Sequence, residues 1–514
     1  MKKVLELARR RLRGEVAPRV LELLARDDCA CGALRDARGV TDGRDGGGVA
    51  VPPSAGTGLP EVWNQGIRSF YDLLRGLPQT GDCSGTACHF VGGRWDGAEP
   101  ETGLHRQFAK EVHCLGRCYE APASSEAAAA PIPRSALSAE PVVLRHLLGA
   151  GPAAAAGPAA WADYDLPGGA AVLNAVTAGG LRGRGGAAYP AGDKWKAARD
   201  TPALERYVVA NGDEGDPGAY IDRLLLEEAP HSVLAGMLAC ARAIGARCGV
   251  VYVRAEYPRA AERVREAVAE AQARGLLGDL EIGVVVGAGS YVAGEETALL
   301  RSIEGLRAEP SPKPPYPARA GLYGLPTIVH NVETLSVVPW VVRSGRRADT
   351  KAVCLAGAVA RPGVVEVDLG TSLRRVLEEG GGGPAQGCTW KMALVGGPLG
   401  RVVGVEDFDV ALSFEALAGM GHAGVVVFDR TVSPRALAEH LFAFACSESC
   451  GTCAPCRIGS SQLASRGSAA DLERLMGTME AGSLCGFGQG VPRPIRDLLR
   501  LYGDEVLGAA GASR

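Results

Sequence analysis

The sequence contains SCGTCAPCR at Ser449–Arg457 and, further along, SLCGFG at Ser483–Gly488. The first stretch has three cysteines in a C-x2-C-x2-C spacing, and the second adds a fourth thiol. Four thiolates suit a 4Fe–4S cluster, because each iron of such a cluster takes one soft anionic ligand. A zinc knuckle is the alternative, although zinc sites usually combine two separate C-x2-C pairs. We therefore expect an electron-transfer cluster, and an electron source elsewhere in the chain, with these ligands: Cys450, Cys453, Cys456 and Cys485.

The bulk properties narrow the class of protein. At 514 residues the chain is too long for one core, so several domains are expected. A formal net charge of −3 gives no basic excess that would indicate nucleic-acid binding. No apolar run reaches the roughly 18 residues of a membrane span, and no signal-peptide core follows the N-terminus, so we expect a cytoplasmic protein. The 15 cysteines occur at short spacings and favour metal ligation over disulfides.

A second cysteine group precedes the centre of the chain. Cys83 and Cys88 form a C-x4-C pair, and Cys114 and Cys118 form a C-x3-C pair. Two pairs of thiolates from two loops fit a 2Fe–2S cluster, with zinc as the alternative. The runs at 85–89 and 114–122 resemble the thioredoxin-like 2Fe–2S subunit of respiratory complex I and its relatives, which implies a domain of that fold here. Cys29 and Cys31 are interpreted as incidental thiols, and Cys446 as a rival ligand of the later cluster.

The central part alternates short β-branched runs with helical patterns. The runs lie at 206–210, 249–254 and 282–286, and one helical pattern spans 258–274. This alternation predicts a parallel α/β sheet. Loops rich in glycine or acids follow at 183–195, 211–220 and 287–297. Such loops can close backbone N–H groups on a phosphate or a flat ring, and the acids can bind ribose or ribityl hydroxyls.

These three loops together resemble the flavin subunit of NADH dehydrogenases, and so do the motifs KPPYP at 313–317 and NVET at 331–334. The resemblance implies FMN, with these contacts: Gly183, Arg184, Gly185, Lys194, Asn211, Asp213, Glu214, Gly215, Tyr291, Gly294, Glu295, Asn331 and Thr334. It implies NAD(H) stacked on the flavin, with these contacts: Gly186, Tyr189, Asp216, Glu296, Lys313 and Tyr316. No side chain need act as a general acid. Glu214 and Glu296 are the residues that we predict to be catalytic. Glu214 is also a candidate for tuning the reduction potential of the flavin.

The alternation of strands and helices predicts a multidomain α/β protein, and the resemblance implies how the chain is divided. The implied parts are an N-terminal helical segment and linker (1–58), a thioredoxin-like 2Fe–2S domain (59–125), a linker around a short helix at 141–148 (126–168), a Rossmann-like FMN/NAD domain (169–345), a β-grasp-like, SLBB-type domain (346–430) and a helical 4Fe–4S domain (431–514). From its residues alone, 346–430 is only a small α+β module. Strands are expected at 364–367 and 425–428. Ser433 and Pro434 predict the start of a helix that leads into the cluster loop, and further helices are expected at 470–479 and 494–502.

A reaction follows from these parts. A nicotinamide exchanges two electrons as hydride, a cluster takes one at a time, and FMN can do both. The chain is therefore expected to be an NAD-dependent oxidoreductase, the diaphorase subunit of a larger complex. The runs at 421–429 and 456–460 look most like β subunits of NAD-dependent formate dehydrogenases. That likeness implies a molybdenum or tungsten catalytic α subunit as partner, and a further iron–sulfur subunit is a second candidate. The alternatives are an NAD-reducing hydrogenase, a complex I-like NADH dehydrogenase and a non-catalytic electron relay.

Overall fold

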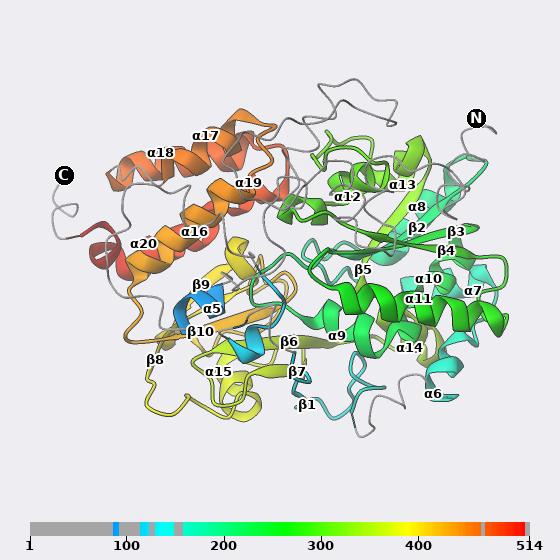
Figure 1. Ribbon diagram of the computed structural model, residues 1–514, viewed down its shortest axis with the longest axis horizontal. Helices are drawn as coiled ribbons and strands as arrows, with labels where there is room; N and C mark the ends of the chain where they lie inside the picture. The colour runs from blue at the N-terminus through cyan, green and yellow to red at the C-terminus, as the bar shows by residue number, and fades with distance from the viewer. Residues whose placement is uncertain are drawn as a thin grey trace, which may run out of the picture.

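A computed structural model describes residues 86–91, 114–121, 123, 129–148, 158–463 and 468–508. Cys83, Cys29 and Cys31 lie outside the described residues, as does most of the expected thioredoxin-like domain. The thioredoxin-like fold and the domain boundaries therefore stay predictions. Within the described ranges, one α/β body lies beside a second sheet and a group of C-terminal helices (Figure 1).

The first sheet has four parallel strands in the order β4-β3-β2-β5. They are β2 (Tyr207–Gly212), β3 (Cys248–Val253), β4 (Glu281–Val286) and β5 (Thr327–Asn331). The three runs predicted as strands are confirmed as β2, β3 and β4, and the predicted helix at 258–274 is confirmed as α11 (Pro258–Ala273). Strand β5 was not predicted. Helices and strands alternate along the chain. Each crossover helix returns the chain to the same end of the sheet, so that successive strands run parallel.

Helices cover both faces of this sheet. Val208 and Val251 point into the core that contains α10 (Pro230–Ile244) and α14 (Val332–Ser344), whereas Val209 and Val250 point to the opposite core. That second core contains α12 (Glu296–Ile303). The remaining helices of this body are α6 (Pro158–Trp161), α7 (Gly169–Ala178), α8 (Ala191–Asp200), α9 (Ile221–Glu228) and α13 (Pro317–Ala320). Both faces are thus buried, as expected of parallel sheets.

The second sheet has six strands in the order β1-β7-β6-β10-β8-β9. They are β1 (Arg134–Ala136), β6 (Thr350–Gly357), β7 (Gly363–Asp368), β8 (Trp390–Val395), β9 (Arg401–Gly404) and β10 (Gly424–Asp429). The strands predicted at 364–367 and 425–428 are confirmed as β7 and β10. β10 runs parallel to β6 and antiparallel to β8, so the sheet is mixed.

The predicted linker between 126 and 168 contains a strand that no sequence pattern indicated. β1 pairs in parallel with β7, with Ser135 opposite Val365. The expected helix at 141–148 is wrong, because this segment consists of turns and bends. The buried carboxylate of Glu366 accepts hydrogen bonds from three consecutive backbone N–H groups here, those of Val142, Val143 and Leu144. These backbone N–H groups therefore form charge-assisted hydrogen bonds to a distant strand instead of the hydrogen bonds of a helix.

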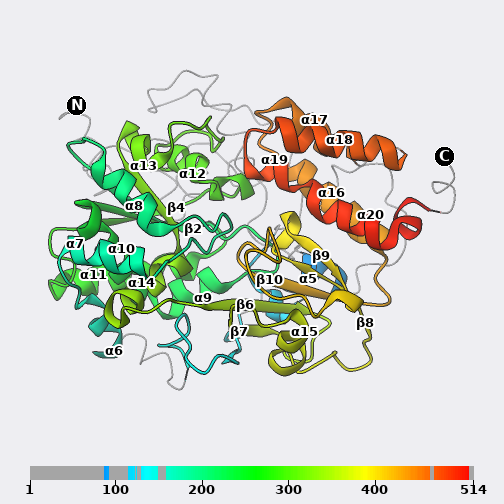
Figure 2. The same ribbon diagram turned by 180° about the vertical axis from the view of Figure 1, so that it is seen from behind.

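The C-terminal part is helical, as predicted. It comprises α16 (Pro434–Glu448), α17 (Ala454–Leu463), α18 (Ala469–Gly482), α19 (Gly486–Gly490) and α20 (Pro492–Leu507). Ser433 caps α16 by accepting a hydrogen bond from the N–H of Ala436, which confirms the predicted helix start. Seen from behind, α20 lies along β9, where Arg401 and Asp497 form a bidentate ion pair with N···O distances of 2.7 and 2.8 Å (Figure 2).

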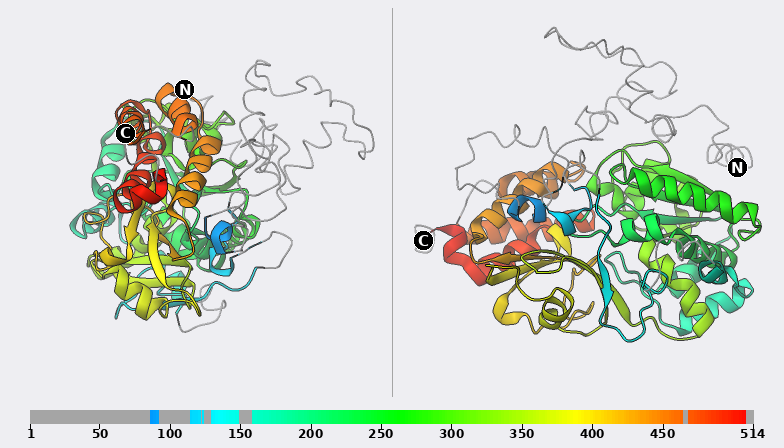
Figure 3. Two further views of the ribbon diagram at one scale, coloured as in Figure 1. Left: turned by 90° about the vertical axis from the view of Figure 1, so that its left-hand side faces the viewer. Right: turned by 60° about the horizontal axis from the view of Figure 1, so that its bottom comes forward.

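The short helix α5 (Thr86–Val91) lies between the second sheet and α16 (Figure 3). The Thr86 hydroxyl lies 3.2 Å from Nε2 of His440 on α16, and the rings of Phe90 and Phe428 meet edge to face.

Among the described residues, no single helix is long and apolar enough to cross a membrane; α9 and α10 reach that length only together and meet at 95°.

We expect Gly236→Ala to lower the free energy of unfolding by about 3 kcal/mol, at the upper end of overpacking penalties. Helices α10 and α14 cross with their backbones in contact, and a Cβ at Gly236 would lie 2.0 Å from the carbonyl oxygen of Leu335. The matched control is Gly477→Ala inside α18, where a Cβ meets nothing within 4 Å. Alanine is favoured in a helix by roughly 1 kcal/mol, so this control should not lower the stability. Equal denaturation midpoints for Gly236→Ala and wild type would contradict the close backbone contact between α10 and α14.

Candidate functional site

The glycine-rich loop is held on the N-terminus of α14. The Arg184 N–H donates to the Thr334 hydroxyl at 2.9 Å. Asn331 caps the helix by accepting from the N–H groups of Glu333 and Thr334. A Cβ at Gly185 would lie 2.8 Å from Cβ of Asn331, so only glycine allows this approach. The loop thus lies beside the positive end of a helix of 13 residues, a favourable place for an anionic group.

The acidic loop and the third loop meet at the carboxyl end of β2. The Asn211 side-chain amide donates to the Gly294 carbonyl at 2.9 Å, and its oxygen accepts from the Asp213 N–H at 3.0 Å. The Tyr291 hydroxyl donates to Asp216 at 2.5 Å. A Cβ at Gly215 would lie 2.8 Å from the Tyr291 ring. The structure therefore brings all three loops together at one edge of the sheet, where open α/β sheets bind ligands.

Asp213 has an unsatisfied buried oxygen at this edge. Its Oδ2 is buried and has no hydrogen-bond partner among the residues that the structure describes. Burial raises the pKa of this carboxyl to about 8, although Arg254 opposes the shift. A buried polar atom without a partner is costly, and a ligand hydroxyl would satisfy it. The residues present thus fit the ribityl chain and phosphate of FMN, with Gly183, Gly185, Thr334 and Asn331 on one side and Asp213 on the other.

The side chain of Arg184, a residue expected among the FMN contacts, does not offer its charge to a ligand. Its guanidinium donates to Glu333 at 3.0 Å and to the carbonyl oxygens of Thr350 and Ala348. Lys351 from β6 also donates to Glu333. Glu333 is completely buried and requires these cations, so the charge of Arg184 is directed inward and only its backbone belongs to the loop.

Lysines and glutamates form a paired rim beside the loops. Lys194 donates to Glu296 at 2.9 Å, and Lys313 donates to Glu295 at 2.6 Å and to Glu296 at 3.2 Å. Burial alone would raise the pKa of Glu296, but the charges of Lys194 and Lys313 lower it overall, so Glu296 is held as the carboxylate. Tyr189 and Tyr316 are 57% and 58% exposed. Both tyrosines, which are expected among the NAD(H) contacts, therefore present an apolar ring surface to an incoming ligand.

Glu214 occupies a different place from the one expected. Its carboxylate is fully buried and accepts the N–H groups of Asp222 and Arg223 at 3.1 Å each, capping α9. The Tyr257 hydroxyl lies 3.3 Å from the same carboxylate. In this arrangement Glu214 has no exposed surface, so any effect on a bound flavin would be electrostatic and not by contact.

His422 joins the acidic loop from the second sheet, a contact that no sequence pattern indicated. Its Nδ1 lies 2.9 Å from Oδ2 of Asp216, and its Nε2 lies 3.6 Å from Oδ2 of Asp222. Asp222 in turn accepts from the Asn331 side chain at 2.5 Å. Asp216 and His422 are 206 positions apart, and no spacing rule could connect them. Asp216, expected as a nucleotide contact, already accepts a hydrogen bond at each oxygen.

The four cysteines expected to hold a 4Fe–4S cluster lie at the ends of three helices. Cys450 follows α16, Cys453 precedes α17, Cys456 lies in the first turn of α17, and Cys485 immediately precedes α19. Burial raises the pKa of Cys485 to about 11, and the N–H groups of Phe487 and Gly488 oppose this by donating to its sulfur. Within the described residues, no three or more metal-binding side chains surround a single-ion position. A cubane does not require this, because each thiolate binds a different iron. Cys446 is exposed on α16.

An aromatic cluster connects the third loop with the cluster cysteines. The Tyr291 ring packs against Phe444 of α16 and Phe487 of α19, at centroid distances of 5.1 and 5.5 Å. The Tyr291 N–H donates to the Glu448 carboxylate at 2.9 Å. Phe487 is two residues from Cys485 and Glu448 two from Cys450, so the candidate flavin loop and the candidate cluster loop form one packed unit.

Three of the four N-terminal cysteines expected as ligands, Cys88, Cys114 and Cys118, lie among the described residues, and all three are buried. The sulfurs of Cys114 and Cys118 are 3.9 Å apart. Two thiolates on one tetrahedral metal at about 2.3 Å would lie about 3.8 Å apart, so this pair suits one iron. Arg223 donates to the Gly116 carbonyl at 3.1 Å and Arg254 to the Cys114 carbonyl at 3.2 Å, which docks this loop beneath the acidic loop.

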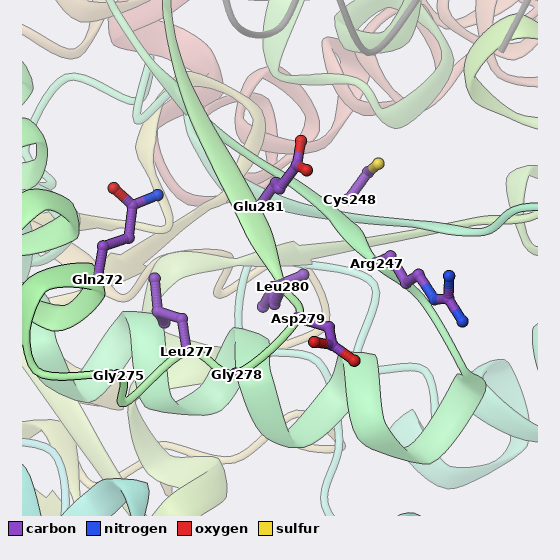
Figure 4. A pocket seen from close by; sticks show the side chains of 9 residues that line it. All are labelled: Arg247, Cys248, Gln272, Gly275, Leu277, Gly278, Asp279, Leu280 and Glu281. Atoms are coloured by element: carbon purple, nitrogen blue, oxygen red, sulfur yellow. The ribbon is translucent and has the colours of Figure 1, made fainter. Parts of the chain in front are cut away.

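A pocket of about 580 Å³ lies elsewhere (Figure 4). It is lined by Arg247, Cys248, Gln272, Leu277, Asp279 and Glu281, among others. Cys248 and Glu281 begin β3 and β4, so the pocket is at the amino ends of the strands, whereas the loops lie at the carboxyl ends. It is not part of the candidate site.

Comparison with known proteins agrees with this geometry. Residues 176–340 match the family described as the Nuo51 FMN-binding domain, residues 352–403 match the SLBB domain, and residues 436–508 match the NADH-ubiquinone oxidoreductase-F iron–sulfur binding region. The β-grasp-like and 4Fe–4S regions expected from the sequence are thereby confirmed as regions of the chain. The family match also confirms the expected FMN-binding domain.

Several relatives are similar over most of their length. The NADP-reducing hydrogenase subunit HndC of Solidesulfovibrio fructosivorans is 42% identical over 369 residues, which are 65% of this chain and 75% of the relative. An NADH-quinone oxidoreductase chain of Escherichia coli (strain K12) is 40% identical over 311 residues, or 56% and 70% of the two chains. A chain in the crystal structure of an NAD⁺-reducing [NiFe]-hydrogenase in the H2-reduced state is similar with a TM-score of 0.74 and 30% identity, covering 87% of each chain. The protein therefore belongs to the family of FMN-binding flavin subunits that complex I-type NADH-quinone oxidoreductases share with NAD(P)-reducing hydrogenases.

Proposed function

We propose that this chain is a diaphorase subunit that passes electrons between NAD(H), FMN and iron–sulfur clusters. The observation that carries the proposal is the contact of Tyr291 with Phe487 and Glu448, because it joins the candidate flavin loop directly to the segments that bear the cluster cysteines. FMN, when bound, supplies the conversion between two-electron hydride exchange and one-electron transfer. The non-catalytic relay is less favoured, because the nucleotide-side residues Tyr189, Tyr316 and Glu296 are present and accessible.

The chain's own residues have separate tasks in this proposal. The N-terminus of α14 and the loop of Gly183 and Gly185 would bind the flavin phosphate, and Asp213 would accept a ribityl hydroxyl. The paired rim of Lys194, Lys313, Glu295 and Glu296 would orient the nucleotide beside the tyrosine rings. Glu296 stays ionised between its lysines, so it would act by hydrogen bonding and charge and not by donating a proton.

We further propose that two clusters flank the flavin. Cys450, Cys453, Cys456 and Cys485 would bind 4Fe–4S, and the N-terminal group Cys83, Cys88, Cys114 and Cys118 would bind 2Fe–2S. The second assignment is supported by the burial of three of these thiols and by the sulfur spacing of Cys114 and Cys118.

For the complex, we propose the β subunit of an NAD-dependent formate dehydrogenase. The runs at 421–429 and 456–460 support it by their resemblance to such subunits. The diaphorase subunit of an NAD(P)-reducing hydrogenase is the second candidate, favoured by the two hydrogenase relatives described above.

Asp213→Ala is expected to raise the dissociation constant of FMN by up to about tenfold, since a lost hydrogen bond to an uncharged group is worth about 0.5–1.5 kcal/mol and tenfold is about 1.4 kcal/mol. The flavin-free chain is titrated with FMN and followed by flavin fluorescence. Asp279→Ala, at the pocket on the opposite edge of the sheet, is the matched control and should bind FMN as wild type does. Unchanged affinity for Asp213→Ala would remove Asp213 from the site.

The reduced protein should give two distinct paramagnetic signals by electron paramagnetic resonance. Cys485→Ser should abolish one signal and Cys118→Ser the other, while Cys446→Ser keeps both. Iron and acid-labile sulfide should fall in parallel with each lost signal. A single signal that survives Cys118→Ser would refute the 2Fe–2S assignment without affecting the 4Fe–4S site.

The native complex should reduce NAD⁺ with formate. Purification of the chain with its partners, followed by assays with formate and with hydrogen as donors, separates the two candidates. Reduction with hydrogen alone would contradict the formate dehydrogenase assignment and support the hydrogenase. Reduction with neither donor, in a complex that still oxidises NADH with a dye, would leave only the diaphorase part of the proposal.

A further inference from the structure

We propose that His422 is a positioning residue through which the β-grasp-like domain holds the flavin site in shape, by bridging the acidic loop and α9 with its imidazole. This inference rests on the proposed function for its flavin readout, whereas the bridge itself is a property of the chain alone. No loop of the α/β body supplies this residue: it comes from the turn that leads into β10 of the second sheet.

The bridge is a carboxylate–imidazole–carboxylate arrangement. Nδ1 of His422 donates to Asp216 at 2.9 Å, and Nε2 forms an ion pair with Asp222 at 3.6 Å. The side chains of His422 and Asp216 are 13% and 12% exposed, and that of Asp222 only 1%. An imidazolium has a donor on each ring nitrogen, so one residue can pair with both acids only in its charged form.

Each carboxylate in the bridge holds a different half of the candidate site. Asp216 accepts the Tyr291 hydroxyl, and the Tyr291 ring packs on the cluster-bearing helices. Asp222 accepts the Asn331 amide, and Asn331 caps α14 beneath the glycine-rich loop. His422 therefore connects the side of the site that faces the cluster with the side that would hold the flavin phosphate.

The second sheet packs closely against the acidic loop and so places His422 beside it. Gly424, two positions after His422, lies against Gly218 of the acidic loop, where a Cβ would come within 2.7 Å of the Gly218 backbone. A Cβ at Gly397 would lie 2.9 Å from Cβ of Asp216. The same sheet supplies a second buried cation, Lys351, to Glu333. Two cations from one domain thus enter an acid-rich interface of the other.

The charged surroundings favour the imidazolium. Burial would lower the pKa of His422, but the hydrogen bond with Asp216 and the charges of Asp222 and Glu214 raise it to about 9. The titratable groups around the bridge are Asp213, Glu214, Asp216 and Arg254 from the α/β loops, Asp222 from α9, Glu333 from α14 and Lys351 from β6; burial raises the pKa of Asp213, Glu214 and Asp222. The pKa in the folded chain lies above the ordinary value of 6.5. The bridge therefore adds full stability below about pH 6.5, and this contribution is lost as the pH rises through about 9.

The test compares the full-length chain with His422→Ala and His422→Asn. Asparagine can keep a donor at the position of Nδ1, towards Asp216, but carries no charge and cannot reach Asp222. The control is His146→Asn, because His146 also pairs with an aspartate, Asp163, at 3.0 Å with the same 13% side-chain exposure, but lies away from the loops. Two readouts are measured: the denaturation midpoint of the flavin-free chain from pH 6 to 9.5, and the dissociation constant of FMN at pH 7.

We expect His422→Ala to raise the dissociation constant of FMN about tenfold, the factor for one interaction of about 1.4 kcal/mol, and to reduce the loss of stability between pH 6.5 and 9. The part of this loss that comes from the raised pKa of Asp213 remains in the variant. His422→Asn should regain part of the FMN affinity but not the pH-dependent stability. His146→Asn should leave the FMN affinity unchanged.

Loss of stability by the same amount at every pH, with unchanged FMN affinity, would make His422 merely a packed residue and overturn the proposal. If the wild-type chain binds no FMN, the proposed function fails and the flavin role of His422 fails with it. In that case the pH profile of the flavin-free chain still decides whether the charged bridge exists, so the two failures are distinguishable.

Discussion

The buried carboxylate of Glu333 is the interaction on which the rest of the site depends. It lies in the first turn of α14 and pairs with Arg184 from the glycine-rich loop and with Lys351 from the second sheet. Removing one partner of a buried ion pair leaves an uncompensated charge and costs about 3–5 kcal/mol. The glycine-rich loop, the helix that it rests on and the neighbouring domain are therefore held in one arrangement, and the backbone N–H groups of the loop are preorganised for an anion.

Elsewhere in the molecule, acidic side chains also join segments that are far apart in the chain, through hydrogen bonds and ion pairs. Glu366 holds 142–144 against the second sheet, and Glu448 accepts the Tyr291 N–H. Asp497 accepts the Val402 N–H and pairs with Arg401. A hydrogen bond from a backbone N–H to a charged acceptor is stronger than one between neutral groups, so these contacts contribute to the alignment of the domains. Electron transfer requires such alignment, because donor and acceptor sites must keep a fixed separation.

Local sequence patterns predicted helices and strands well where the structure of a segment depends mainly on its own residues. The β-branched runs of β2, β3 and β4, the proline start of α11 and the Ser433 cap of α16 all depend on neighbours within a few positions. The cysteine spacings and glycine loops were visible for the same reason. The prediction was wrong at 141–148, where Glu366 takes the backbone N–H groups, and β1 was not predicted because a strand of three residues has almost no pattern of its own.

Residue types and spacings alone indicated the chemistry that this chain can support: four thiols in a cluster spacing, glycine loops after parallel strands, and a resemblance to the flavin subunit of NADH dehydrogenases that the comparisons confirmed. Which side chains face the site depended instead on how the domains pack. This packing directed the Arg184 charge to Glu333, buried Glu214 under α9, and brought His422 to Asp216 across 206 positions. The physical reason is that residue type and spacing act locally, whereas the pairing of a buried charge depends on which partner the packed domains place within reach.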